Sequence, residues 1–276
     1  MKKKVLIVGG TGFLGRKVSV RLADCYDVIV ASHSISGDGI VTYSSVDNLL
    51  EQLYQYEIFA IVNCAVLYDR LNKGGDEVEQ VNLSLPLELA RYAQSTGVSL
   101  FLSCDSFYRR FIFGVSANNY VQHKKLLYKQ LKGMARNSET KIVVAVIHHM
   151  FGAGDSPEKI VNKLVETLKN SGSLTLSACQ QNRYFVDVDY VVEIVNEILV
   201  ESERLHLFSE IDIAGNYYLS TKDFLRKVSG MINSGNIYFD ESMILPIDRN
   251  IVYKKPLPKW FSSHQKDLED SLKQLI

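Results

Sequence analysis

Tyr120 and Lys124 stand four residues apart in a segment of helical character, so their side chains share one face of the predicted helix. An ammonium group near a phenol favours the phenolate, which predicts that the pKa of Tyr120 lies below its usual value of about 10. A phenol poised in this way can pass a proton to or from a carbonyl or alcohol oxygen at neutral pH. The pair indicates the proton transfer that accompanies hydride transfer, but both residue types are common and the spacing needs support.

Support comes from a glycine pattern at the start of the sequence, VLIVGGTGFLG, which spans residues 5–15. Gly9 permits a tight turn after an apolar strand, Gly12 lets the backbone approach a pyrophosphate, and Gly15 lets helix and strand pack closely. Unpaired N–H groups and a partial positive charge at the helix N-terminus favour phosphates. The pattern predicts a dinucleotide site. The residues assigned to it are Gly9, Thr11, Gly12, Phe13, Leu14 and Gly15.

The end of the second predicted strand bears on the choice of cofactor. An NAD site usually has Asp or Glu there to bind the ribose hydroxyls. This strand ends in Ser32 and His33, and the next acidic residue is Asp38. Without a carboxylate to repel it, a 2′-phosphate can be hydrogen-bonded by Ser32 and His33. NADP(H) is therefore favoured, with NAD(H) as the alternative.

Apolar, β-branched runs alternate with helical segments over the first half of the chain. The runs are continuous in their hydrophobicity, which is typical of strands buried on both faces. The predicted strands cover 5–8, 27–31, 59–66, 98–103 and 141–147, and the predicted helices cover 12–24, 46–56, 76–96 and 119–137. This alternation predicts an α/β fold, a Rossmann-type doubly wound parallel sheet whose strand ends meet along one ligand-binding edge.

The pattern changes after residue 150. A turn-rich passage leads to a predicted helix over 157–170, short strands at 174–177 and 184–188, and a helix over 189–203. We expect residues 1–150 to form the NAD(P)-binding domain, with 178–203 returning to it. Residues 151–177 and 204–276 are expected to form a smaller, C-terminal substrate-binding lobe over the ligand edge of the sheet.

Composition excludes several classes of function. The 276 residues carry 31 basic and 31 acidic side chains, so the chain lacks the positive field that gathers nucleic acid. Its four cysteines form no metal-ligand spacing, which predicts free thiols and no metal site. The opening MKKKVLIVGG has an apolar run too short for a secretory signal, and no later run approaches the length of a membrane span. We expect a cytoplasmic protein that binds no membrane.

These motifs together resemble the extended short-chain dehydrogenase/reductases of the NAD-dependent epimerase/dehydratase family, which act on nucleotide sugars. Residues 5–15 are similar to the family's glycine loop, and Tyr120 with Lys124 to its catalytic pair. Further similar segments are FLSCDSFY (101–108), MFGAGDS (150–156), NRYFVDVDYVV (182–192) and the position of Asn82. Within the family, the segments at 105–108 and 220–225 are most similar to sugar-nucleotide 4-ketoreductases of the CDP-abequose synthase type.

The resemblance implies a role for each matching residue. Tyr120 would be the general acid that protonates the 4-keto oxygen, and Lys124 would bind the nicotinamide ribose. Cys104 stands in the position of the family's Ser or Thr, which hydrogen-bonds the same oxygen. Strand ends and turns would add cofactor contacts from Cys64, Ala65, Val66, Ser103 and His149. Substrate contacts would come from Asp105, Ser106, Asn82 and Arg183, the last of these on the nucleotide diphosphate.

Several positions depart from the family pattern. A thiol is a weaker donor than a hydroxyl, so Cys104 does the task less well, Ser103 or Ser106 takes it over, or the enzyme is impaired. Arg109 and Arg110 replace the usual glycine and are interpreted as surface charges instead of phosphate ligands. Arg183 is alternatively an exposed loop residue. His149 either lines the nicotinamide pocket or is a buried imidazole with satisfied hydrogen bonds.

The reaction is predicted by elimination. A 4,6-dehydratase needs an Asp–Glu pair, but Asp105 is followed by Ser106. An epimerase must retain NAD, and the missing acid after the second strand disfavours this. We expect an NAD(P)H-dependent reductase of a nucleotide-linked 4-keto-6-deoxy sugar, used in deoxysugar and O-antigen (lipopolysaccharide) synthesis. An epimerase with retained NAD and a non-catalytic NAD(P)-binding module remain the alternatives.

The resemblance also implies a homodimer formed through the predicted helices 76–96 and 119–137. Residues proposed for the seam are Tyr92, Leu126, Leu127 and Leu131. A face buried within one chain would have the same apolar pattern, so both interpretations stay open.

Overall fold

The structure, a computed structural model, describes residues 2–69, 75–111, 118–245 and 252–276. The chain divides into two compact units. Unit 1 comprises Met1–Arg110, Ser116–Val146 and Val192–Ile211, and unit 2 comprises Phe111–Val115, Ile147–Val191 and Asp212–Ile276. The strand at 182–187, which the sequence-based division assigned to the dinucleotide-binding part, lies in unit 2. The binding roles of the two units stay predictions.

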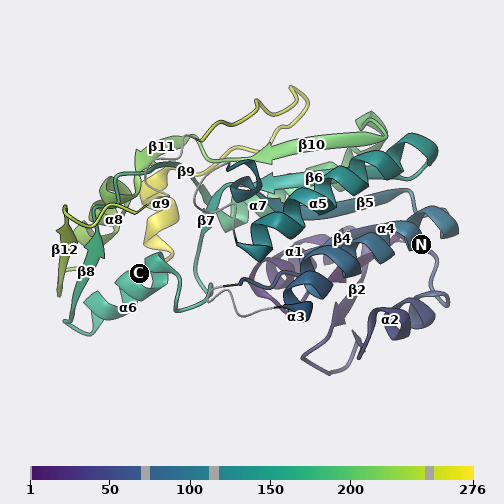
Figure 1. Ribbon diagram of the computed structural model, residues 1–276, viewed down its shortest axis with the longest axis horizontal. Coiled ribbons are helices and arrows are strands. Elements are labelled where there is room, and N and C mark those ends of the chain that lie inside the picture. Colours follow the sequence, from purple (N-terminus) through teal and green to yellow (C-terminus); the bar gives the residue numbers. More distant parts are fainter. Residues whose placement is uncertain (1, 70–74, 112–117, 246–251) are drawn as a thin grey trace. The chain divides into compact units, whose positions relative to one another are not determined.

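Unit 1 is built on a mostly parallel seven-stranded sheet in the order β10-β6-β5-β4-β1-β2-β3 (Figure 1). Its strands are β1 (Lys4–Val8), β2 (Asp27–Ser32), β3 (Ile40–Thr42), β4 (Ile58–Asn63), β5 (Leu100–Ser106), β6 (Lys141–Ile147) and β10 (Phe208–Ile213). The central strand β1 pairs in parallel with β2 and β4, and its last four side chains are fully buried. The predicted Rossmann-type α/β fold is confirmed.

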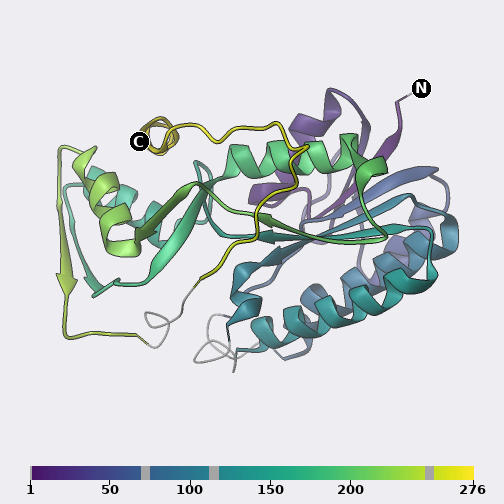
Figure 2. The same ribbon diagram turned by 90° about the horizontal axis from the view of Figure 1, so that it is seen from above.

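Helices cover both faces of this sheet. They are α1 (Phe13–Ala23), α2 (Val46–Leu53), α3 (Asp76–Glu79), α4 (Leu85–Thr96), α5 (Asn119–Met134) and α7 (Val188–Val200). Figure 2 shows α4 and α5 on one face, and α1 on the other face beside α7. An ion pair between Arg21 of α1 and Glu193 of α7, at 2.7 Å, joins the helices of that second face.

The predicted continuous helix over 76–96 is wrong, because a π-helical segment, Gln80–Ser84, separates α3 from α4. Pro86 lies in the first turn of α4 and lacks the N–H that would bond to the carbonyl of Asn82. The Leu85 N–H instead bonds to the carbonyl of Gln80, five residues back. The wider turn places Asn82 wholly inside the protein.

Three of the four proposed dimer-seam residues pack inside the chain. Tyr92, Leu127 and Leu131 are at most 4% exposed, and α4 and α5 contact each other directly. Their apolar pattern therefore reflects packing within unit 1, not an open seam. Leu126 is 42% exposed and is the residue of this set still available to a partner. The homodimer stays a prediction.

Within its described residues, unit 2 contains two small sheets and three helices. A three-stranded sheet has the order β11-β9-β7, with β9 parallel to β7 and antiparallel to β11, and a second sheet pairs β12 with β8. The strands are β7 (His149–Phe151), β8 (Ser173–Ser177), β9 (Asn182–Asp187), β11 (Tyr217–Ser220) and β12 (Asn236–Asp240). The helices are α6 (Ile160–Lys169), α8 (Thr221–Gly230) and α9 (Leu268–Lys273).

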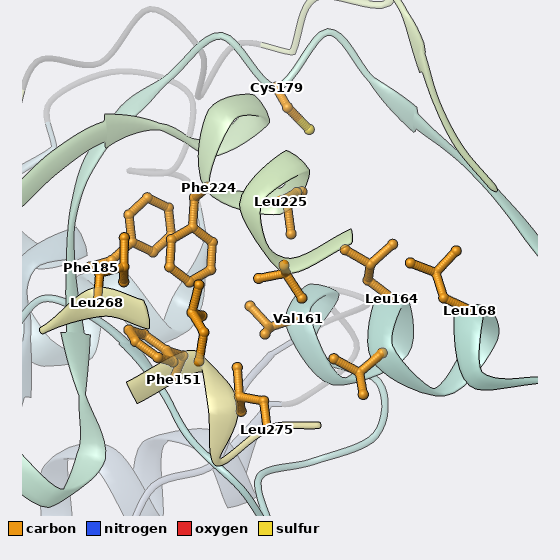
Figure 3. Close-up of a cluster of buried hydrophobic side chains, with 13 residues drawn as sticks. Phe151, Val161, Leu164, Leu168, Cys179, Phe185, Phe224, Leu225, Leu268 and Leu275 are labelled. Carbon is orange, nitrogen blue, oxygen red and sulfur yellow. The ribbon is translucent and has the colours of Figure 1, made fainter. Parts of the chain in front are cut away.

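An aromatic stack forms the centre of unit 2. The rings of Phe185 in β9 and Phe224 in α8 lie parallel with centroids 3.8 Å apart, and Phe151 of β7 meets Phe224 edge-on (Figure 3). Leu268 of α9 lies beside the rings, and Leu164 and Leu168 of α6 extend the same cluster away from them. Unit 2 thus has its own hydrophobic core. No helix among the described residues combines the length and apolar character that a membrane span requires.

Candidate active site

The carboxyl ends of the central strands bring the candidate residues of unit 1 together. Parallel strands all end at the same edge of a sheet, so the turn after β1 lies beside the ends of β2 and β4, and the end of β5 follows next to β4. Gly9, Ser32, Cys64 and Cys104 stand at or just beyond these ends. The topology therefore gathers at one edge residues up to 95 positions apart in sequence.

The glycine turn has the close backbone packing that its residue types predict. Gly9 has φ +74°, and its N–H bonds to the carbonyl of Ala31 in β2. A Cβ at Gly9 would lie 2.7 Å from the backbone nitrogen of Ala65. A Cβ at Gly15 would lie 2.2 Å from the Gly9 carbonyl oxygen, so Gly15 lets α1 pack against the turn itself.

Gly12 leaves the start of α1 open for a pyrophosphate group to approach the backbone. It is the exposed N-cap of α1, it is extended, and it has no side chain with which to cap the helix. Outside its chain neighbours, the atom nearest to a Cβ built there is the Gly9 carbonyl oxygen, at 3.3 Å. Phe13 and Leu14 begin the helix, and Ala65 and Val66 become progressively exposed beyond β4. These residues fit a dinucleotide.

A hydrogen bond joins the glycine turn to the end of β2. The hydroxyls of Thr11 and Ser32 are 2.9 Å apart, and the Ile35 N–H donates to Ser32 Oγ. Ser32 is only 2% exposed, so its hydroxyl is engaged inside the protein instead of facing a ligand. His33 is exposed and packs edge-on against Tyr43. Of the two proposed 2′-phosphate ligands, His33 is the accessible one.

Tyr120 begins α5 and lies buried beside β5. The ring of Tyr68 covers it at a centroid distance of 5.2 Å. Burial raises the pKa of Tyr120 well above its usual value, the charges of Tyr68 and Asp105 add to the rise, and a hydrogen bond with Ser106 opposes it. The expected lowering of this pKa by Lys124 is wrong for the unliganded protein. Burial outweighs the ammonium, and the phenol holds its proton at neutral pH.

Lys124 lies one turn after Tyr120 in α5 and is 2% exposed. Its Nζ donates a hydrogen bond to the carbonyl oxygen of Cys104 at 3.1 Å and lies 5.9 Å from the Tyr120 ring centroid. Burial lowers the pKa of Lys124, opposed by the charges of Asp105, Cys104 and Cys64. The structure therefore brings both members of the predicted pair to the end of β5.

Cys104 and Ser106 share one side of β5 but point to different partners. Cys104 Sγ lies 3.8 Å from Cys64 Sγ, whereas Ser106 lies near the Tyr120 phenol and lowers its pKa. Of the residues considered for the family's Ser or Thr position, Ser106 contacts the phenol. Ser103 is fully buried on the opposite side, and its hydroxyl has no hydrogen-bond partner among the described residues.

Asp105 belongs to a buried ion network. Arg109, in the 3₁₀ turn Phe107–Arg110, donates its Nε to Asp105 Oδ2 and its Nη2 to Glu210 Oε1 of β10 at 2.6 Å. Its guanidinium also lies over the Tyr128 ring, 3.9 Å from the centroid. Arg109 is only 8% exposed, so its interpretation as a surface charge is wrong. Arg110 reaches the same Glu210 oxygen at 3.1 Å.

Asn82 supports the chain instead of facing a ligand. Its Nδ2 donates to the carbonyls of Leu67, at 2.7 Å, and Val78, at 2.9 Å, and its Oδ1 accepts from the Leu67 N–H. The side chain is fully buried. The assignment of Asn82 to substrate binding is therefore corrected: it holds the segment after β4, from which Tyr68 covers Tyr120.

Two candidates lie in unit 2. Arg183 in β9 is 1% exposed, donates to the carbonyl of Asn182 and lies over the Phe111 ring, so the exposed-loop alternative is wrong. His149 in β7 packs edge-on against Phe185, with centroids 5.0 Å apart. Burial, aided by the charges of Arg183 and Lys159, lowers the pKa of His149 to about 3, so its imidazole is neutral at physiological pH.

Sequence reasoning missed three residues beside Tyr120 and Asp105. Glu210 is more than 100 positions from Asp105 and carries no local motif. Tyr68 and Asp69 follow β4, where Asp69 accepts hydrogen bonds from Asn118 and Asn119 at the start of α5. For Tyr68 and Asp69, the position beyond the end of a strand was a usable signal in the sequence.

The profile of the NAD dependent epimerase/dehydratase family matches residues 5–208. The chain belongs to this family. The match covers the glycine turn, Tyr120 with Lys124, and Asp105 with Arg109, and it ends at the first residue of β10, before Glu210. The family resemblance inferred from the sequence is thereby confirmed.

Two curated relatives of the chain are CDP-abequose synthases. The chain is 22% identical to CDP-abequose synthase of Salmonella typhimurium over 296 aligned positions, which cover 100% of this chain and 99% of the relative. It is 23% identical to the CDP-abequose synthase of Salmonella muenchen, over 73% of this chain and 71% of that relative.

Solved structures share the fold. UDP-N-acetylglucosamine 4-epimerase from Methanobrevibacter ruminantium M1, in complex with UDP-N-acetylmuramic acid, has a TM-score of 0.83 at 16% identity, covering 100% of this chain and 97% of that one. UDP-glucuronic acid 4-epimerase from Bacillus cereus, in complex with UDP-glucuronic acid and NAD, has a TM-score of 0.78 at 17% identity, covering 98% and 97%.

Proposed function

We propose that this family member is a sugar-nucleotide-modifying enzyme, specifically an NADPH-dependent reductase of a nucleotide-linked 4-keto-6-deoxy sugar. Its product would be an activated deoxy sugar for a surface polysaccharide. The observation that carries the proposal is the burial of the Tyr120 phenol at the end of β5, one turn before the buried Lys124 and near the Ser106 hydroxyl. Two hydroxyl donors side by side, next to a dinucleotide turn, suit one ketone oxygen that becomes an alcohol.

The residues of unit 1 divide the task. When bound, the nicotinamide supplies the hydride. The glycine turn and the start of α1 would hold the dinucleotide, and Lys124 would bind its ribose. Tyr120, protonated because burial raises its pKa, gives its proton to the carbonyl oxygen, while Ser106 donates a hydrogen bond to the same atom.

The environment of Asp105 disfavours a dehydratase. A 4,6-dehydratase needs a carboxyl group free to exchange protons, and here Asp105 is held against the Arg109 guanidinium. The next residue, Ser106, offers no general base. We therefore assign Asp105 the role of holding the 3₁₀ turn through Arg109, and not a role in acid–base catalysis.

The end of β2 supports NADPH as the reductant. Its last residue is Ser32, and the following segment, 33–39, is exposed with Asp38 as its one acidic residue. A 2′-phosphate there meets His33 and backbone N–H groups instead of a carboxylate. Substrate binding by unit 2 completes the proposal.

An absorbance assay tests the proposal. Purified protein is mixed with NADPH and a CDP- or dTDP-linked 4-keto-6-deoxyhexose, and the reduced nicotinamide band is followed. We expect loss of the band at one NADPH per alcohol formed, and faster turnover with NADPH than with NADH. No loss of the band with either cofactor, or a tightly bound NAD in the purified protein, would overturn the reductase assignment.

Replacement of Ser106 with Ala is expected to lower kcat by about 10²-fold with little change in KM, because the hydroxyl stabilises charge that develops at the ketone oxygen. Ser106 lowers the pKa of Tyr120, so its replacement should also raise that pKa further. Steady-state kinetics of the variant provide the measurement. Ser95→Ala, which removes a hydroxyl bonded within α4, is the matched control. Equal kcat values for the two variants would contradict the role of Ser106.

A further inference from the structure

Cys64 and Cys104 form a thiol pair at the catalytic edge of unit 1. Cys64 is the first residue after β4, Cys104 lies near the end of β5, and their sulfurs are 3.8 Å apart. The two strands are paired in parallel, with Asn63 opposite Ser103 as the last pair, so the cysteines stand at the next position of the same register. The contact thus follows from the strand order of the sheet.

The backbone spacing at this position suits a disulfide. Neighbouring strands lie about 4.8 Å apart, within the Cα separation of about 4.4–6.8 Å that disulfides span. Cys64 lies one residue beyond the last residue of β4 that pairs with β5, and its N–H bonds to the Val8 carbonyl of β1. Side-chain rotation can therefore bring the sulfurs together without separating the strands.

The other two cysteines provide internal references. Cys25 is exposed just after α1, and Cys179 is buried in the hydrophobic core of unit 2. Cys64 and Cys104 are each partly exposed, and the buried ammonium of Lys124 lies beside them, bonded to the Cys104 carbonyl. The hydrogen bond with Cys104 and burial raise the pKa of Cys64 well above its usual value, and the charge of Lys124 opposes this rise. Peroxide reacts with the thiolate, so the oxidation draws on the minor form that Lys124 favours.

We propose that Cys64 and Cys104 are a reversible oxidation site, a dithiol that hydrogen peroxide converts to a disulfide across the ends of β4 and β5. This lies beyond the proposed reductase function, which uses neither thiol as a redox group. The oxidant is a peroxide, and the reductant that restores the site is a small or protein dithiol.

The chemistry balances in two steps. One thiolate attacks a peroxide oxygen: an S–O bond forms, the O–O bond breaks, and the hydroxide that leaves takes up a proton as water. The second thiol attacks the resulting sulfenic sulfur: an S–S bond forms, the S–O bond breaks, and a second water leaves. Two thiols lose two electrons and two protons to one peroxide, and a dithiol reverses the change by exchange.

The disulfide would disturb the candidate active site at two points. It would cross-link Cys104, whose carbonyl accepts the Lys124 hydrogen bond, to Cys64, the neighbour of Ala65, whose backbone approaches Gly9 closely. Ser106 stands two residues further along β5. Oxidation is therefore expected to suppress activity reversibly, an effect that rests on the proposed function, whereas the disulfide itself does not.

The test is peptide mapping of peroxide-treated, full-length protein by mass spectrometry. We expect a mass loss of about 2 Da, a cross-linked peptide joining Cys64 to Cys104, and recovery of both thiols with dithiothreitol. A Cys25→Ser/Cys179→Ser variant should behave in the same way, and wild type serves if that variant does not fold. In Cys64→Ser, the product at Cys104 should instead gain oxygen or capture added glutathione.

Two results would overturn the proposal. One is a wild-type product in which Cys64 or Cys104 gains oxygen without a link between them. The other is survival of both thiols under peroxide that fully oxidises the exposed Cys25. Because the readout is a mass, failure of the reductase assay leaves this test intact. If the reductase assay succeeds, activity should fall and recover in parallel with the cross-link.

Discussion

Replacement of Tyr120 with Phe is expected to lower kcat for ketone reduction by about 10³-fold, because the variant lacks the acid that protonates the substrate oxygen. The phenyl ring should still pack against Tyr68, so the fold should persist. Steady-state NADPH oxidation with the keto sugar gives the rate, and thermal unfolding shows that the fold is retained. The loss should appear in kcat more than in KM, since the proton moves only in the transition state.

The pH dependence follows from the direction of the Tyr120 pKa. Because burial raises this pKa well above 10, the phenol stays protonated between about pH 6 and 9, and Tyr120 should cause no loss of the reduction rate there.

Tyr54→Phe, which removes an exposed hydroxyl at the end of α2, is the matched control for Tyr120→Phe and should leave kcat unchanged. A Tyr120→Phe enzyme with more than about a tenth of wild-type kcat would contradict the assignment of Tyr120 as the acid.

Replacement of Arg109 with Met is expected to lower the free energy of unfolding by about 3–5 kcal/mol. Met has similar length but no charge, and the change leaves the buried carboxylate of Asp105 without its guanidinium partner. Glu210 would keep its contacts with Arg110 and with the Tyr128 hydroxyl. Urea denaturation followed by circular dichroism measures the loss, provided that the dependence of the unfolding free energy on urea concentration has the same slope in variant and wild type.

A surface arginine provides the control for this effect. Arg91 pairs with Glu88 along α4, and both side chains are well exposed, so Arg91→Met should cost less than about 1 kcal/mol. In a triple variant, Asp105→Asn/Arg109→Met/Glu210→Gln, no buried carboxylate is left uncompensated, and most of the stability should return. A cost below about 1 kcal/mol for Arg109→Met would show that the network contributes little to folding.

The elements that begin and end by local rules were predictable. Continuous apolar runs indicated β1, β2, β4, β5 and β6 within a few residues, and the glycine spacing indicated the turn before α1. The short strands β3 and β7 and most elements after residue 204 were not predicted. Their partners are distant in sequence, and short segments of mixed polarity become strands only when a neighbouring strand supplies their hydrogen bonds.

The candidate site divides in the same way. The residue types and their spacing determined that Tyr120 and Lys124 share a helix face and that Gly9 opens a turn. Tertiary structure decided that Ser106 contacts the phenol, that Cys104 faces Cys64, and that Arg109 is buried against Asp105 and Glu210. It also reversed the expected direction of the Tyr120 pKa. The physical reason is that periodicity orients a side chain relative to its own backbone, whereas strand order and burial choose its neighbours and the dielectric around it.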